Sequence, residues 1–191
     1  MTIEEIKSKY ENGRIPLNKL KKVEEGQYLV KKAGESYLRM KADAKKDGII
    51  FELPYATSTY RPCGDEGDYR NGQCKDGLFT QWCAWEKYKA GAGNLASNPT
   101  TSRGCTSNHG WGLAIDVKPT KAQNWIKQNG EKYGWWWSGG TFGQIENWHF
   151  DYDEKRDTFR SKKGGKIVLY SFIGLSLIGI GLGLYFATRK K

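Results

Sequence analysis

Hydrophobic residues recur at roughly helical spacing in the segment from Lys32 to Lys46. They are Ala33, Tyr37, Leu38 and Met40. This spacing places apolar side chains on one face of a helix. The next two residues, Asp47 and Gly48, are typical of a turn that ends a helix. The pattern therefore predicts a helix over residues 32–46, followed by a turn.

Two strands are predicted from shorter apolar patterns. Residues 49–53 form a short apolar run, and over residues 113–117 leucine, isoleucine and valine alternate with alanine and aspartate. Such alternation is the signature of a strand with one buried face. Between the two strands, residues 78–90 are helix-like and lead into a glycine-rich loop at residues 90–99. This mixed order indicates an α+β domain.

The segment from Ile167 to Thr188 is a run of 22 residues without a charged side chain. At about 1.5 Å per residue, a helix of this length crosses the core of a bilayer. Because the run is apolar on every side, it predicts a transmembrane helix and not a buried helix of a globular domain. Gly179 and Gly183 form a GxxxG pattern, which allows two such helices to self-associate.

The basic, glycine-containing stretch at residues 155–166 is typical of a juxtamembrane linker that rests on anionic headgroups. We therefore expect a single-pass protein of a host cell or virion membrane, with the lipid bilayer as a partner. Its topology stays open, because the basic residues at 160–166 nearly balance those at 189–191. Residues 1–14 lack the basic and apolar regions of a secretory signal peptide.

Composition narrows the class of protein. The hydrophobic content of 38% and aromatic content of 14% exclude a wholly disordered chain, and 191 residues suffice for one catalytic-size domain. A net charge of +10 draws the protein to polyanions, whether nucleic acid, anionic lipid or an acidic wall polymer. Charge alone does not choose among these partners, and excess lysine is equally compatible with a solvated surface.

The chain has two histidines, and each lies in a cluster with a carboxylate. His109 precedes Asp116 by seven positions, and Glu146 precedes His149 by three. Two imidazoles and one carboxylate are a common ligand set for catalytic zinc, which keeps a fourth position for water. A second carboxylate that does not bind the metal can accept the proton of that water. The clusters therefore indicate a zinc centre.

The expected geometry agrees with this hypothesis. In the strand over residues 113–117, Asp116 lies on the face opposite the large apolar side chains. The odd separation between His109 and Asp116 requires a turn, which Gly110 and Gly112 can form. A similar bend is expected at residues 147–148, because residues three apart cannot share a face of one strand.

These residues carry a resemblance to a known family. The segments SNHGWGLAID and ENWH match S-x-H-x-x-G-x-A-x-D and E-x-W-H, the pattern of VanY-type zinc D-alanyl-D-alanine carboxypeptidases and related phage L-alanyl-D-glutamate endopeptidases. Residues 58–61 resemble the S-x-Y-R segment of this family, and Gln81 resembles the glutamine that follows it. The resemblance covers roughly residues 30–152. An extra stretch at residues 62–78 departs from the pattern and puts substrate specificity in doubt.

The resemblance implies a role for each matched residue. Zinc would be the cofactor, with His109, Asp116 and His149 as its ligands. Glu146 would be the general base, and Arg61 would stabilise the scissile carbonyl as it gains negative charge. The residues expected to contact substrate are Ser107, Gln81 and Trp148.

The four cysteines lack the close spacing of a structural zinc site, so disulfides or free thiols remain. Four cysteines allow three disulfide connectivities. We prefer Cys63 with Cys74, which would close the extra stretch, and Cys83 with Cys105. Disulfides would require an oxidising compartment, which suits an enzyme that faces the cell wall.

We therefore expect an α+β fold, with a small antiparallel sheet and flanking helices around a zinc cleft, plus one C-terminal transmembrane helix. The expected function is hydrolysis of peptidoglycan stem peptides, as a carboxypeptidase or endopeptidase, in cell-wall degradation by a phage or virus. The alternative is an inactive wall-binding or virion structural protein on the same fold. A nucleic-acid partner is not expected, because no stacking or helix-turn-helix motif is present. The expected parts are an N-terminal segment 1–29, a peptidase domain 30–154, a linker 155–166, a membrane helix 167–188 and a basic tail 189–191.

Overall fold

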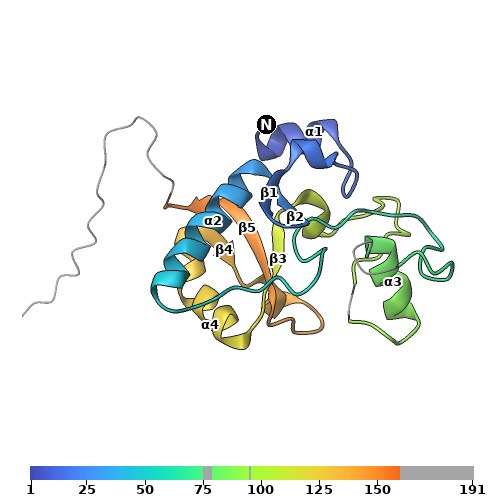
Figure 1. The fold of residues 1–191 in the computed structure, drawn as a ribbon. Coiled ribbons are helices and arrows are strands. Elements are labelled where there is room, and N and C mark those ends of the chain that lie inside the picture. Colours follow the sequence, from blue (N-terminus) through green and yellow to red (C-terminus); the bar gives the residue numbers. More distant parts are fainter. Residues whose placement is uncertain (75–78, 95, 160–191) are drawn as a thin grey trace, which may run out of the picture. The chain divides into compact units, whose positions relative to one another are not determined.

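A three-stranded antiparallel sheet lies at the centre of the fold (Figure 1). The strand order is β3 (Ala114–Asp116), β5 (His149–Asp157) and β4 (Tyr133–Trp136), so β5 is hydrogen-bonded on both sides (Figure 1). This computed structural model describes residues 1–74, 79–94 and 96–159. The expectation of an α+β domain with a small antiparallel sheet and flanking helices is confirmed.

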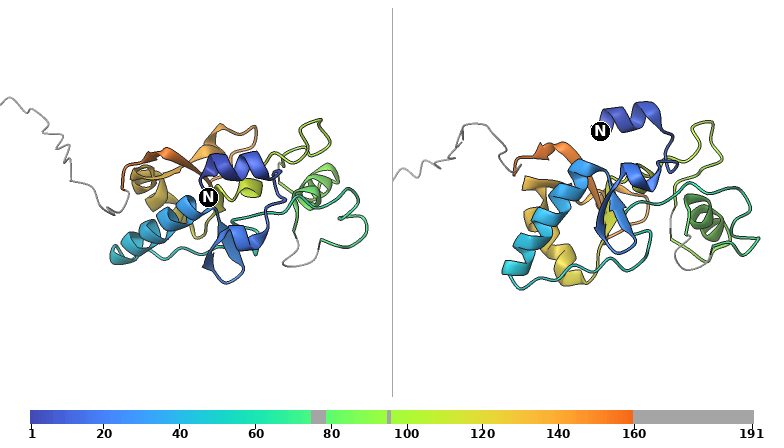
Figure 2. Two further views of the ribbon diagram at one scale, coloured as in Figure 1. Left: turned by 90° about the horizontal axis from the view of Figure 1, so that it is seen from above. Right: turned by 45° about the horizontal axis from the view of Figure 1, so that its top comes forward.

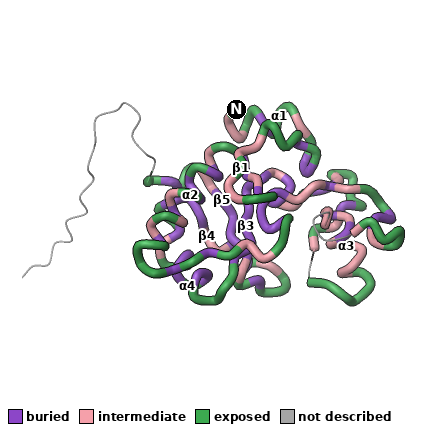
Figure 3. Tube along the Cα trace, viewed as in Figure 1, coloured by how far each residue is buried: buried purple, intermediate pink, exposed green. Residues whose placement is uncertain are grey.

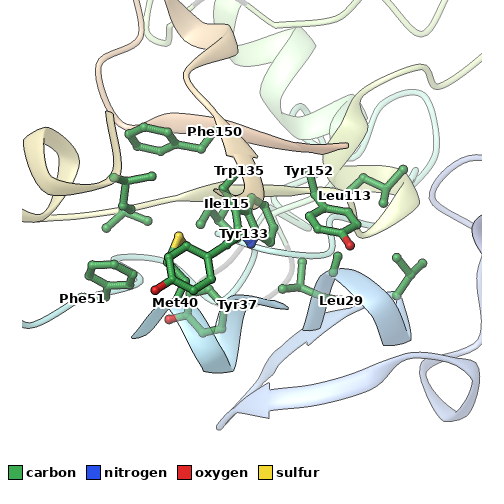
Figure 4. Close-up of a cluster of buried hydrophobic side chains, with 14 of the residues drawn as sticks. Leu29, Tyr37, Met40, Phe51, Leu113, Ile115, Tyr133, Trp135, Phe150 and Tyr152 are labelled. Atoms are coloured by element: carbon green, nitrogen blue, oxygen red, sulfur yellow. The ribbon is translucent and has the colours of Figure 1, made fainter. Parts of the chain in front are cut away.

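The core lies between the sheet and helices α2 (Lys31–Lys46) and α4 (Thr120–Asn129). Figure 4 shows large aromatic and aliphatic side chains filling this layer, with Trp135 of β4 beside Tyr37 of α2. Their rings meet edge to face at a centroid distance of 6.5 Å, an arrangement that aromatic pairs favour. Burial of this layer fixes the sheet, and with it the direction of each strand's side chains.

The predicted helix over residues 32–46 is confirmed as α2. Tyr37 and Met40 are fully buried, whereas Leu38 is 38% exposed and lies outside the apolar face. Gly48 follows with a φ of 72°, and its amide donates to the carbonyl of Lys45. The left-handed conformation at this glycine ends the helix as expected.

The prediction of a strand at residues 49–53 is wrong. Here the chain forms only an isolated bridge, in which Glu52 and Lys118 exchange two backbone hydrogen bonds of 2.8 Å. Pro54 follows and has no amide hydrogen to continue a ladder. The apolar character of the run has another cause, because Phe51 packs into the core against Trp125 at a ring-centroid distance of 5.9 Å.

The first 29 residues contribute to the same core. Helix α1 (Ile3–Lys9), a short η1 turn (Leu17–Lys19) and a hairpin of β1 (Lys21–Glu24) and β2 (Gln27–Leu29) precede α2. The buried hydrophobic side chains in this segment are Ile6, Ile15 and Leu29. They belong to the same hydrophobic core as the side chains of the sheet and α2. The boundary expected at residue 30 stays a prediction.

Helix α3 (Gln81–Lys89) lies on the side of the sheet away from α2, in all three views of Figures 1 and 2. Thr80 caps it by accepting a hydrogen bond from the amide of Cys83. Only Gln81 and Cys83 of the helix are buried, and Figure 3 shows this region mostly in the colours of intermediate and exposed residues. The segment is therefore helical as predicted, but it adds little to the core.

All four cysteines form disulfides, but the preferred pairing is wrong. The bonds are Cys63–Cys105 and Cys74–Cys83. The extra stretch folds back on α3, where Glu86 accepts hydrogen bonds from the amides of residues 67 and 69, and this brings Cys74 to Cys83. Cys63 is left beside the loop that carries Cys105.

The expected localisation in a membrane is corrected. Among residues 1–74, 79–94 and 96–159, no helix combines the length and the apolar character that a bilayer crossing needs. The expected membrane helix at 167–188, with Gly179 and Gly183, lies outside the described residues, as does the tail 189–191. Strand β5 continues to Asp157, so the linker expected at 155–166 begins within a strand.

Candidate metal centre

The three predicted metal ligands come from three adjacent elements. His109 lies in the η2 turn (Asn108–Trp111), Asp116 ends β3 and His149 begins β5. The register pairs Asp116 with His149 directly, whereas the neighbouring pair, Ile115 and Phe150, is fully buried in the core. Because side chains alternate across a strand, Asp116 and His149 share the face opposite this core pair.

The turn expected between His109 and Asp116 depends on two glycines. Gly112 ends η2 in the left-handed conformation, with a φ of 63°. A Cβ atom at Gly110 would lie 1.9 Å from Oδ1 of Asn12, so no larger residue fits without movement. Gly112 therefore allows the chain to reverse, and Gly110 leaves room for the buried side chain of Asn12.

The ligand atoms of the three side chains converge. His109 Nε2 lies 3.2 Å from His149 Nδ1 and 3.2 Å from Asp116 Oδ1, and His149 Nδ1 lies 3.1 Å from the same oxygen. All three residues are buried, and together they form a group that can hold a metal ion. Tetrahedral zinc with bonds of about 2.1 Å separates its ligand atoms by about 3.4 Å, so this donor set fits zinc closely.

The remaining ring nitrogens are also engaged. Nδ1 of His109 lies 2.7 Å from the carbonyl oxygen of Thr59, and Nε2 of His149 lies 3.1 Å from Oδ1 of Asp151. A nitrogen that donates to such an acceptor leaves the opposite nitrogen free to bind a metal. These contacts therefore direct His109 Nε2 and His149 Nδ1 into the site.

Burial and charge separate the protonation of these groups. Burial lowers the pKa of His109, which favours the neutral imidazole that a metal requires. Burial opposes ionisation of Asp116, yet the two histidines hold its pKa well below the usual range. For His149, burial also acts against the charged form, but hydrogen bonds to Asp116 and Asp151 raise its pKa to about 10. In the absence of metal, a proton on His149 therefore balances the carboxylates.

Glu146 lies in the loop between η4 (Ser138–Thr141) and β5. Its Oε2 is 4.0 Å from Nδ1 of His149, and a turn at residues 147–148 makes the expected bend. The loop is fixed behind the side chain, where the Glu146 amide donates to the carbonyl of Gly139 and its carbonyl accepts from the indole of Trp137. Burial is the main cause that raises the pKa of Glu146, which brings this carboxyl closer to the range of a general base.

Arg61 faces the same site. Its Nη2 lies 3.2 Å from Oδ2 of Asp116, and its amide donates to the carbonyl of His109. The Nε atom is buried without a hydrogen-bond partner among the residues that the structure describes. Arg61 thus presents a fixed positive charge beside the ligand group, with a donor still unused.

The group opens into a cleft of about 1040 Å³. On one side the cleft is lined by Arg61, Glu146 and the three candidate ligands. On the other side its wall includes Phe79 and, from α3, Ala84 and Lys87. Because the buried ligand group lines this cleft, a peptide-sized molecule has access to the metal position.

Comparison with known proteins shows which solved structures have a similar fold. No family model matches the chain, and no curated protein matches it in sequence. Among solved structures, VanYB in complex with D-alanine-D-alanine matches with a TM-score of 0.50 and 16% identity, covering 77% of this chain and 80% of the other. The VanY D,D-pentapeptidase with Zn(II) gives a TM-score of 0.46 and 16% identity over 75% of this chain and 86% of its own. The LdcB LD-carboxypeptidase gives a TM-score of 0.47 and 19% identity, covering 75% of this chain and 70% of its own.

The chain has a VanY-like fold. At 16% identity the likeness to VanYB shows the architecture alone, and the chemistry depends on the residues already described. The fold agrees with the resemblance found in the two histidine motifs.

Two of the three residues expected to contact substrate reach the cleft of this VanY-like fold. Ser107 and Trp148 line it, and the hydroxyl of Ser107 also accepts a hydrogen bond from the amide of His109. Gln81 is different, because it is 2% exposed and its amide group contacts Asn12 and the backbone of Ser107. Gln81 therefore joins α3 to the metal-binding loop and does not line the cleft.

Sequence reasoning missed Asp151 and Asn12. Asp151 could have been found, because it lies two positions after His149 and strand alternation places both on one face. Asn12 gives no such signal. It donates to the carbonyl of Ser107, a residue 95 positions away in the sequence, at 2.8 Å.

Proposed function

We propose that the chain is a zinc-dependent peptidase that hydrolyses peptide bonds in the stem peptides of bacterial peptidoglycan. The observation that carries this proposal is the convergence of three buried ligand atoms within 3.2 Å of one another at a cleft that Glu146 also lines. A structural metal site would be closed by a fourth protein ligand. Within the described parts of the chain, this group has three members, which leaves a position for water or substrate.

In this function His109, Asp116 and His149 hold zinc, which when bound polarises the scissile carbonyl and acidifies a water molecule. Glu146 accepts a proton from the attacking water while the oxygen of that water forms a bond to the carbonyl carbon of the substrate. Glu146 then gives this proton to the leaving amine as the C–N bond breaks.

Arg61 contributes a positive charge that stabilises the transition state. Its partly buried guanidinium donates to the carbonyl oxygen as negative charge develops there. The contact of Arg61 with Asp116, at 3.2 Å, holds the guanidinium beside the metal position before substrate binds. This pre-organisation favours the charged transition state over the neutral ground state.

Two observations support a peptidoglycan substrate. The histidine motifs resemble those of peptidoglycan carboxypeptidases and endopeptidases, and the fold matches VanYB, which was determined with D-alanine-D-alanine. Ser107 and Trp148 lie in the cleft as the substrate contacts of this proposal. The domain limits of 30–154 and a role in wall degradation by a phage or virus remain predictions from the sequence.

Digestion of purified muropeptides by the full chain tests the proposal. Mass spectrometry should find products in which one peptide bond of the stem is hydrolysed, and 1,10-phenanthroline should stop their formation. Free D-alanine identifies carboxypeptidase action, and stems cut internally identify endopeptidase action. The Glu146→Gln variant is the matched control for contaminating hydrolases. Intact muropeptides after digestion by fully zinc-loaded protein would contradict the proposal.

An inactive wall-binding protein on the same fold is the other candidate. It would bind muropeptides without cleaving them, and it would have no use for a general base. Glu146 is 8% exposed, with its pKa raised by burial, and it lies 4.0 Å from a candidate ligand. Because burying such a carboxyl group is unfavourable, its position favours the enzyme.

A further inference from the structure

Asp151 is a buried carboxylate that none of the proposed catalytic steps uses. It is 6% exposed and lies in the central strand, where its backbone is opposite Ala114 of β3 and Trp136 of β4. Strands on both sides fix its Cα position. A buried charge needs a compensating partner, which here is an imidazole.

The main partner of Asp151 is Nε2 of the His149 ring, the nitrogen that faces away from the other two candidate ligands. The ring lies between two carboxylates, with Nδ1 at 3.1 Å from Asp116 and Nε2 at 3.1 Å from Asp151. Phe142 packs against the same ring at a centroid distance of 5.1 Å. The ring is therefore constrained at both nitrogens and by an aromatic contact.

We propose that Asp151 is a positioning residue for the metal site, which holds His149 with Nδ1 directed at the metal and strengthens the binding of a divalent cation. The inference rests on the proposed zinc function. His109 offers an internal comparison, because its outer nitrogen donates to the neutral carbonyl of Thr59 at 2.7 Å. A carboxylate acceptor makes the ring more electron-rich than a carbonyl does, so His149 is the stronger donor to the metal.

Charge gives the second reason. The ionised carboxylates at the site are Asp116, Glu146 and Asp151, and the cation beside them is Arg61, which contacts Asp116. Together these groups leave two negative charges, which one divalent cation balances. Removing the charge of Asp151 would leave the zinc-loaded site with an excess positive charge in a buried environment, where such an imbalance is unfavourable.

Zinc affinity of graded variants tests this inference. Asp151→Asn keeps the shape and an acceptor oxygen but loses the charge, and Asp151→Ala loses both. Competition with a chromophoric chelator should show affinity weakened about tenfold by the first and up to about 100-fold by the second. Asp153→Asn is the control, because Asp153 lies two positions further along β5 and its side chain is 42% exposed. It should bind zinc as the parent does.

A second readout separates positioning from a general loss of structure. In the zinc-loaded parent, ¹H–¹⁵N NMR should place the proton of His149 on Nε2, and Asp151→Ala should shift that resonance or broaden it by exchange, while the resonances of His109 stay unchanged. Should Asp151→Ala fail to fold, Asp151→Asn carries the test. Zinc affinity within twofold of the parent in both variants would overturn the inference and leave the proposed function standing. A parent chain that binds no zinc would overturn both.

Discussion

The two walls of the cleft are built in different ways. The wall that carries the candidate ligands is formed by the β3–β5–β4 sheet and the η2 turn, and the sheet is backed by the aromatic core and by α2 with its six buried residues. The opposite wall includes α3, which buries two residues and is linked to the extra stretch by the Cys74–Cys83 disulfide. The candidate catalytic residues thus lie on the wall that is held by core packing. The opposite wall buries few side chains and is held by the Cys74–Cys83 disulfide.

Hydrogen bonds of Gln81 and Asn12 join the two walls. Gln81, the first residue of α3, donates to Asn12 at 2.7 Å, and Asn12 donates to the carbonyl of Ser107 beside the metal-binding loop. The Cys63–Cys105 disulfide runs in parallel, from two residues after Arg61 to four residues before His109. The walls therefore have different supports and are joined by hydrogen bonds and one disulfide, so substitutions in each wall should have separable effects.

The largest effect is expected on the sheet side, from Gly139→Ala. A Cβ atom there would lie 2.0 Å from the carbonyl oxygen of Glu146, so the loop must move and carry the general base with it. Because a shift of about 1 Å can cost about 100-fold in rate, kcat should fall by that order while one zinc is retained per chain. Steady-state kinetics and elemental analysis check this. An unchanged kcat would show that the loop does not position the base.

An intermediate effect is expected on the α3 side, from the double variant Cys74→Ser, Cys83→Ser. Opening a loop of this length removes about 3 kcal/mol of stability by chain entropy, and α3 has little burial to replace it. KM for a muropeptide should rise several-fold, whereas zinc stoichiometry and kcat should change little. A loss of zinc would show that the two walls are not independent.

The smallest effect is expected at the contact between the walls. Asn12→Ala leaves the amide of Gln81 and the carbonyl of Ser107 without their buried partner, which should lower the free energy of unfolding by about 1–3 kcal/mol. Denaturant unfolding measures the change. Asn18→Ala, at an exposed position in η1, is the matched control and should have little effect. Equal stability of the two variants would contradict the structural role of Asn12.

Sequence patterns predicted best where a local rule acts. Helix α2 followed from spacing, and the facing of Asp116 followed from alternation in β3 together with the glycine turn before it. The same alternation could have identified Asp151 had it been applied beyond His149. These features depend on neighbours in the sequence, which is why a pattern records them.

Features that depend on distant partners were missed. The Asn12 contact spans 95 positions, and the Cys63–Cys105 bond spans 42. Gln81 was matched to a substrate contact by its motif, yet its amide is engaged by residues that only the folded chain brings near. Polarity in the sequence shows that a side chain needs a partner but not which partner it finds.

The most direct test of a zinc peptidase compares Glu146→Gln with His109→Ala on one muropeptide substrate. Glu146→Gln keeps the shape of the side chain but cannot accept a proton, so it should bind zinc and substrate nearly as well as the parent while losing most of its turnover. His109→Ala should lose zinc and turnover together, because it removes one of three ligands. Near-normal hydrolysis by zinc-loaded Glu146→Gln would contradict the account.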